Sequence, residues 1–138
     1  MALQYSVAVR NAQLDVVEST ISSSAKLRLY SGSAPANCAA AATGTMLINM
    51  TLPSDWMAAA SSGSKALSGS WTMTGDAGAG TGTAAGYFRV WDSGVTTAHI
   101  QGTVTVTAGG GDMTLDNTSI ASGQTVTVTT FTLAAGNA

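Results

Sequence analysis

Apolar and polar residues alternate strictly over two long stretches in the C-terminal third of the chain. Within residues 100–107 and 124–131, valine stands between threonines at every second position. A period of two places successive side chains on opposite faces of a strand, and β-branched residues suit a pleated surface. We therefore predict two strands, each with an apolar face to bury and a threonine face that can meet water or another protein.

Two earlier segments carry a similar signal. Residues 25–30 alternate strictly, which places Leu27 and Leu29 inward and leaves the residues between them, and Tyr30, outward. Residues 46–52 form an apolar run that ends at a proline, and proline cannot donate a hydrogen bond to a strand ladder. Both segments are therefore predicted to be strands.

Residues 7–21 form the one stretch with helical spacing. Leu14, Val17 and Ile21 recur near one face together with Val7. The charged residues fall on another face, namely Arg10, Asp15 and Glu18. This pattern predicts one amphipathic helix, ended by the serines that follow it.

The middle of the chain predicts shorter elements. Residues 54–60 favour one helical turn, because a serine stands where an N-cap is needed. Residues 65–67 and 70–74 predict either one strand kinked at the glycine between them or two short strands. In both cases Trp71 and Met73 share a face.

Two further segments lack large side chains. Residues 31–45 predict a long surface loop, and the glycine-rich residues 75–82 predict either a mobile loop or a close backbone approach to a neighbour. Side chains that would pin a segment to the core are missing from residues 1–5, 31–45 and 75–86. We expect contacts with a partner to come from these three segments.

The highest aromatic density, in residues 86–92, predicts a central strand. Phe88 and Val90 are the favoured pair to face the core. The alternative is that Tyr87, Arg89 and Trp91 face the core instead. A turn then leads to an antiparallel partner strand at residues 98–107. Residues 109–112 predict a second hairpin turn onto a short strand at 113–115, and the last strand is predicted at 124–133.

Seven or eight strands after one helix predict an all-β fold. We expect an antiparallel β-sandwich, jelly-roll-like or immunoglobulin-like, with one N-terminal amphipathic helix. The length of 138 residues fits a single β-sandwich domain, residues 1–138. Residues 1–24 would form its helical segment and residues 25–138 its β body.

Charge is scarce in this chain. Charged residues make up 9% and the net charge is −2, whereas an ordinary soluble domain has about 25% charged residues. The five Lys and Arg form no basic stripe, which argues against nucleic acid as a partner. Nothing predicts a membrane span or an ordinary secretory signal. The neutral surface predicts assembly, and exposed strand edges favour a homodimer.

Residues able to do chemistry are not clustered along the sequence. His99 stands alone in a predicted strand with no nucleophile elbow anywhere, and Cys38 is the one cysteine. Asp76, Asp112 and Asp116 could supply oxygen ligands for calcium, but their spacing fits turns and strand ends better. We therefore predict no enzyme, and no catalytic, cofactor-binding or metal-binding residues.

The three tryptophans leave one alternative open. Trp56, Trp71 and Trp91 could pack in the core, anchor an interface or stack against a sugar. A carbohydrate-binding β-sandwich module is therefore the alternative from another functional class.

Four segments resemble a family of small virion proteins of tailed bacteriophages. They are KLRLYSGSAP at 26–35, MTLP at 50–53, GYFRVWD at 86–92 and GGDMTLDN at 110–117. The chain is similar in particular to the capsid cement (decoration) proteins of short-tailed phages. This resemblance implies a jelly-roll-like fold that clamps the outside of a shell of major capsid protein, in a virion assembled in the host cytoplasm. A tail or neck component is the alternative within virion proteins, and the family has no catalytic residues to carry over.

Overall fold

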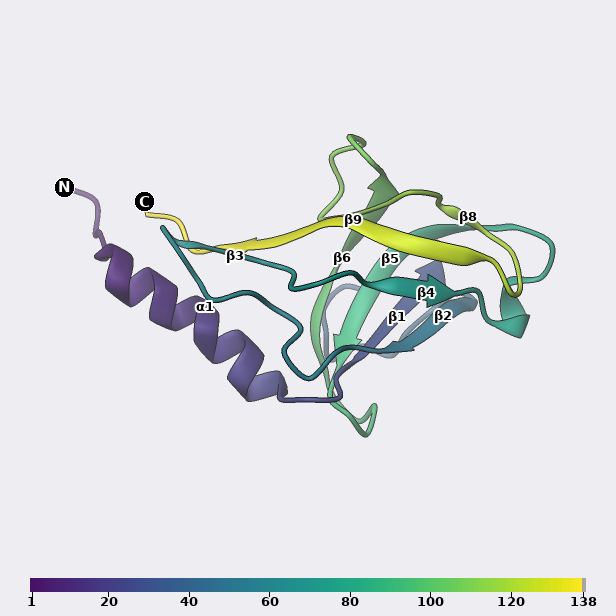
Figure 1. Ribbon diagram of the computed structural model, residues 1–138, viewed down its shortest axis with the longest axis horizontal. Coiled ribbons are helices and arrows are strands. Elements are labelled where there is room, and N and C mark those ends of the chain that lie inside the picture. Colours follow the sequence, from purple (N-terminus) through teal and green to yellow (C-terminus); the bar gives the residue numbers. More distant parts are fainter. Residues whose placement is uncertain (138) are drawn as a thin grey trace.

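The computed structural model describes residues 1–137 and contains one α-helix, one short 3-10 turn and nine strands (Figure 1). The all-β class with one N-terminal helix is confirmed. The helix, α1, spans Val7–Ile21 as predicted, and the 3-10 turn, η1, spans Ala77–Ala79. The strands are β1 (Lys26–Ser31), β2 (Met46–Thr51), β3 (Ser64–Ala66), β4 (Thr72–Thr74), β5 (Thr83–Trp91), β6 (Ala98–Val106), β7 (Met113–Leu115), β8 (Ser119–Ile120) and β9 (Thr125–Ala134).

The strands form one curled sheet in the order β2-β1-β5-β6-β7-β9-β3, with β4 also paired to β9 and β8 to β5. The sheet curls so that β2 meets the residues that follow β4: Ile48 bridges Gly75, and the Asp76 N–H donates to the Leu47 carbonyl at 2.8 Å. The two halves of the sheet therefore face each other across one core, as in a sandwich. A jelly-roll strand order stays a prediction.

One strand pair differs from the antiparallel prediction. Residues 109–112 do not close a hairpin, because β7 pairs parallel to β6, with Val104 opposite Met113. The glycines of the turn explain this path. A Cβ on Gly111 would lie 2.9 Å from the Thr105 side chain, so only glycine lets the chain fold back closely over the end of β6.

Aromatic rings join the two halves of the sheet. Phe88 of β5 meets Phe131 of β9 edge to face, with ring centroids 5.5 Å apart. Trp71 lies 5.5 Å from Phe131 and 6.1 Å from Trp56. Both Trp56 and Trp71 are fully buried, and Met73 is buried beside them, so the shared face of Trp71 and Met73 is confirmed.

The helical turn predicted at residues 54–60 is wrong. This segment is irregular, and Met57 forms a bridge with Leu67 instead. The reason is burial: Trp56 and Met57 are consecutive, and both lie in the core. The two-strand alternative for the following residues is the one observed, as β3 and β4.

Strand β5 is buried on both faces. Phe88 and Val90 lie in the main core, as favoured, while Tyr87 and Arg89 are fully buried on the opposite face. Tyr30, which the alternation placed outward, is also buried, because its ring stacks on Tyr87 with centroids 5.0 Å apart. The segment between β1 and β2 packs over this face of β5.

Candidate binding surfaces

The loop of residues 32–45 is fixed to the body by Arg89. The guanidinium donates to the carbonyls of Ala40 at 2.8 Å and Asn37 at 3.1 Å, and twice to Gln101 Oε1, at 3.1 and 2.9 Å. Its Cζ lies 5.5 Å from the ring centroid of Trp91. No carboxylate of residues 1–137 forms a salt bridge with this buried cation. Arg89 is therefore held by neutral oxygens and an aromatic ring.

Two further side chains close the same loop. The Tyr87 hydroxyl donates to the Thr43 carbonyl at 2.6 Å and accepts from the Thr43 N–H at 2.9 Å. The Gln101 side chain donates to the Pro35 carbonyl at 2.8 Å. The expectation that nothing pins residues 31–45 is wrong, because the anchoring side chains come from β5 and β6.

The glycine-rich segment is also anchored. Ala79 is fully buried, and the Ser122 N–H donates to the Gly80 carbonyl at 2.9 Å. A Cβ on Gly75 would lie 2.0 Å from the Ala121 carbonyl oxygen, which confirms the predicted close backbone approach. The expectation that this segment lacks anchors is therefore wrong.

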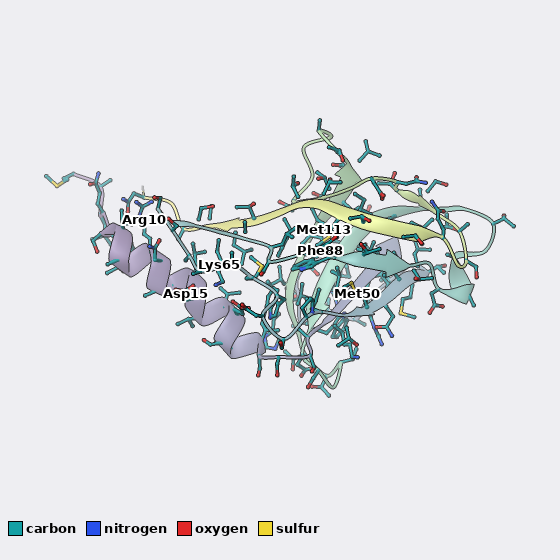
Figure 2. All side chains as sticks on the ribbon, in the orientation of Figure 1. Arg10, Asp15, Met50, Lys65, Phe88 and Met113 are labelled. Carbon is teal, nitrogen blue, oxygen red and sulfur yellow. The ribbon has the colours of Figure 1, made fainter. Side chains whose placement is uncertain are left out.

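Helix α1 turns its charged residues toward the body. In Figure 1, α1 runs along β3 and the end of β9, away from most of the sheet. Figure 2 shows Asp15 and Lys65 pointing toward each other across this contact. The Arg10 Nη1 donates to the Ala135 carbonyl at 3.2 Å, and the Asn11 side chain accepts from the Gly63 N–H at 2.8 Å. We call α1, β3 and the end of β9 the arm.

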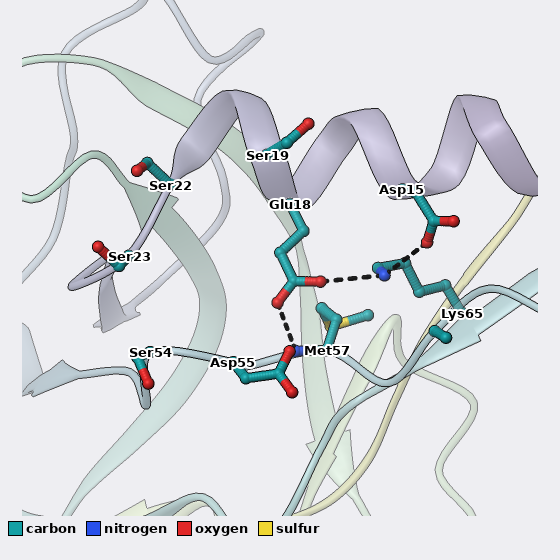
Figure 3. Close-up of a pocket in the computed structure, with 10 residues that line it drawn as sticks. Asp15, Glu18, Ser19, Ser22, Ser23, Ser54, Asp55, Met57 and Lys65 are labelled. Carbon is teal, nitrogen blue, oxygen red and sulfur yellow. Dashed lines mark hydrogen bonds and ion pairs between the residues drawn. The ribbon is translucent and has the colours of Figure 1, made fainter.

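The centre of this contact is Lys65, only 3% exposed. Its Nζ lies 2.8 Å from Asp15 Oδ1 and 3.0 Å from Glu18 Oε2 (Figure 3). Burial alone would lower the pKa of Lys65, but the two carboxylates outweigh it and raise that pKa. The hydrogen bond from Lys65 lowers the pKa of Asp15, with help from the Ala60 N–H. Glu18 also accepts from the Met57 N–H at 3.0 Å, so it joins the arm to the core.

A hollow of about 550 Å³ lies beside this ion pair. It is lined by the same carboxylates, by Asp55 and by several serines, as Figure 3 shows. Lys65 is already engaged by both helix carboxylates. The hollow therefore presents no free cation to an incoming anion.

The exposed side of α1 has one half-exposed charge, Asp15, at its edge. Val9, Ala12 and Val16 lie on it, and Val16 is 58% exposed. Gln13, Ser19 and Thr20 are exposed on the same side of the helix, so this face mixes polar and apolar residues. Ahead of it, Leu3 is 71% exposed, and Tyr5 is tied to the Asn137 side chain by two hydrogen bonds of 2.8 and 3.2 Å.

A neutral surface lies over β6 and β9, with β7, whose three residues are all buried, between them. These strands contain no Lys, Arg, Asp or Glu. Threonine hydroxyls are linked across them: Thr114 meets Thr129 and Thr130 at 2.6 Å each, and Thr107 meets Thr129 at 2.8 Å. We call this surface the threonine face. These hydrogen bonds link the threonine side chains of neighbouring strands to one another.

The structure places the predicted aspartates at turns and strand ends. Asp76 caps η1, Asp112 accepts from the Thr103 N–H at 2.8 Å, and Asp116 accepts from the Thr127 N–H at 2.9 Å. The hydrogen bonds from Thr103 lower the pKa of Asp112. Within residues 1–137, no three His, Cys, Asp or Glu side chains lie close enough together to hold a metal ion.

The other residues considered for chemistry or binding lie apart from one another. His99 lies in β6 beside α1, and Cys38 lines a hollow of about 540 Å³ with Trp91. Burial removes Trp56 and Trp71 as sugar-stacking platforms, which leaves Trp91. The alternation in residues 100–107 and 124–131 predicted the threonine face. Which charged residues of α1 meet the body was not predictable in this way, because it depends on Lys65, far along the chain.

In comparisons with protein-family models, with curated proteins and with solved structures, the chain matches none of them. Among residues 1–137, no helix is long and apolar enough to cross a membrane.

Proposed function

We propose that this chain is a structural virion protein that binds the outer surface of a phage capsid and stabilises its shell of major capsid protein. The observation that carries the proposal is the threonine face, a surface over β6 and β9 whose strands contain no Lys, Arg, Asp or Glu and whose threonine hydroxyls are hydrogen-bonded to one another. A protein that cements a shell needs a stiff body and a broad neutral contact, and it needs no reacting groups. The resemblance of four segments to capsid cement proteins supports the same role.

The parts of the molecule suit that role. Arg89 and Tyr87 fix the loop of residues 32–45, so the body offers a preformed surface and little ordering entropy is lost on binding. Attachment through hydroxyl and apolar contacts, repeated over many copies, reaches high avidity without charge steering. Binding to capsids should therefore depend little on salt.

A rebinding experiment tests the proposal. Shells lacking the protein are mixed with wild type or with the double variant Thr127→Lys, Thr129→Lys. We expect wild type to decorate shells and raise their melting temperature, with occupancy unchanged up to about 0.5 M salt. In the double variant, two lysines would be buried against the capsid without a partner, and this should weaken binding by about 100-fold.

The matched control is Ser93→Lys, Gly94→Lys, which adds the same charges at the exposed turn between β5 and β6. Circular dichroism confirms that all variants fold. Wild-type occupancy by the Thr127, Thr129 variant would contradict the proposed surface. Failure of wild type to bind shells, with binding to tails, necks or a glycan array instead, would replace the function with one of its alternatives.

A further inference from the structure

We infer that the hollow beside Trp91 is a binding site for a neutral sugar, one pyranose residue of a glycan. This inference does not depend on the capsid role. It rests on the ring surface that Trp91 presents, on the uncharged lining around it, and on a strained turn that holds two threonines of this lining in place.

The hollow has the size of a ligand site. Its volume is about 540 Å³, and ligand pockets span about 300–1,000 Å³. Its lining comes from the end of β5, the loop of residues 32–45 and the turn before β6, namely Trp91, Cys38, residues 39–41 and residues 96–98. Because Arg89 holds the loop by the carbonyls of Asn37 and Ala40, the hollow is formed before a ligand arrives. The three alanines at 39–41 keep it open, since larger side chains there would fill it.

Trp91 offers this hollow a carbon surface. The ring is partly exposed, but its Nε1 is buried and has no hydrogen-bond partner among residues 1–137. The exposed part of the ring is therefore carbon. The Arg89 guanidinium lies over one ring face, with its Cζ 5.5 Å from the ring centroid, so a ligand can stack only on the other face. A pyranose has a flat face of C–H groups that suits such a surface, with hydroxyls around its edge.

The polar groups of the lining are hydroxyls. The Thr96 hydroxyl donates to Asp92, which leaves its lone pairs to accept from a ligand. Thr97 is exposed beside it, so its hydroxyl can both donate and accept. The lining residues carry no charge, and the guanidinium of Arg89 is already engaged by carbonyl and amide oxygens. An acidic sugar would lose hydration here without meeting a cation, so the site favours a neutral one.

The turn that carries these threonines is strained. Figure 1 shows it extending from the body between the end of β5 and the start of β6. Val95 has a φ of 56°, a left-handed conformation that a β-branched residue rarely adopts. The Asp92 carboxylate holds it by accepting from the N–H groups of Thr96 at 2.7 Å and Thr97 at 3.2 Å. Strain of this kind gathers at binding sites, and here it fixes the two threonines at the hollow.

A bound sugar would leave the threonine face uncovered. Ala98, in the lining, begins β6, whereas Thr107, in the threonine face, follows the end of that strand. Nine residues of strand span about 30 Å. One copy can therefore contact a shell and a glycan at the same time.

NMR titration of the full chain, without capsids, tests the inference. The probes are the methyl β-glycosides of glucose, galactose and N-acetylglucosamine. We expect at least one to shift the Trp91 indole N–H signal saturably, with a Kd of about 1 mM. Trp56 and Trp71 are internal controls, because both are fully buried in the core and their signals should stay in place. Methyl β-glucuronide, which is anionic, should bind at least about 10-fold more weakly.

Two variants of the loop separate binding from folding. Ala39→Leu places a larger side chain in the hollow and should weaken sugar binding by about 10-fold or more. Ala36→Leu is the matched control, because Ala36 is exposed in the same loop and does not line the hollow. Equal urea midpoints for the two variants show that neither effect is misfolding. Trp91→Ala should abolish binding, and Ala39→Leu checks that result with the Arg89 contact to the ring intact.

The absence of a saturable Trp91 shift with all three neutral sugars would overturn the inference. Equal shifts at Trp56 and Trp71, undiminished binding by Ala39→Leu, or glucuronide binding as tight as neutral binding would also overturn it. Failure of shell binding in a protein that still binds sugar would leave this inference intact and contradict the capsid role.

Discussion

The body and the arm each bury one cation, and they hold it in different ways. Arg89 in the body is surrounded by carbonyl and amide oxygens and by the Trp91 ring. Lys65 in the arm is held by two carboxylates, Asp15 and Glu18. The planar guanidinium can satisfy several neutral acceptors at once, whereas a compact ammonium needs opposite charge when it is buried. The loop of residues 32–45 is thus fixed through neutral acceptors, and the arm through carboxylates.

The largest loss of unfolding free energy is expected from Arg89→Met. The substitution leaves the Asn37 and Ala40 carbonyls without their donor and frees the loop, so it should lower the free energy of unfolding by about 4 kcal/mol. Urea unfolding measures the change. Arg28→Met is the control, since Arg28 is partly exposed and bonds only to the Asn49 side chain. Equal losses for both variants would show that Arg89 does not fix the loop.

A smaller loss is expected from Lys65→Met. Both helix carboxylates lose their partner, but Asp15 is half exposed and water can solvate it, so we expect a loss of about 3 kcal/mol. The loss should come with lower helical content, because α1 detaches from β3. Lys26→Met, at a partly exposed position of β1, is the control. Unchanged helix signal in a destabilised variant would contradict the assignment of Lys65 to the arm.

The smallest effect is the pH dependence that Asp15 and Lys65 give to the arm. The pKa of Asp15 is lowered on folding, so its contribution is complete above its ordinary value of 3.8 and is lost as pH falls through the folded pKa. The pKa of Lys65 is raised, so its contribution is complete below 10.5 and is lost as pH rises through the folded pKa.

Circular dichroism against pH measures this dependence. The helix signal should fall at both extremes of pH while the strand signal persists longer. Asp15→Asn should remove the acid step that belongs to Asp15, and Asp55→Asn should leave it in place. An acid step of the same size in Asp15→Asn would show that other groups cause it.

Local periodicity predicted most elements of this fold. Residues 7–21 gave the helix bounds, and the alternation at residues 25–30, 98–107 and 124–133 gave three of the longest strands, because each pattern is set by neighbours along the chain. The parallel pairing of β6 with β7 could not be predicted this way. It depends on a glycine turn that folds back onto Thr105, which is a tertiary contact.

The binding surfaces were less predictable than the fold. The sequence of residues 31–45 does not show that this loop is fixed to the body. The side chain that fixes it, Arg89, lies in β5, and the alternation along that strand does not show which partner the arginine has. The charges of α1 suggest a helix with a solvated charged face, whereas Lys65 draws two of them toward the body. What remains for a protein partner is the threonine face, which the alternation of valine and threonine did predict.

The most direct test of the proposed role is electron cryomicroscopy of particles assembled with and without this chain. The account predicts added density on the outside of the shell, with the threonine face against the major capsid protein. Density confined to the tail or neck, or identical shells in the two preparations, would contradict it.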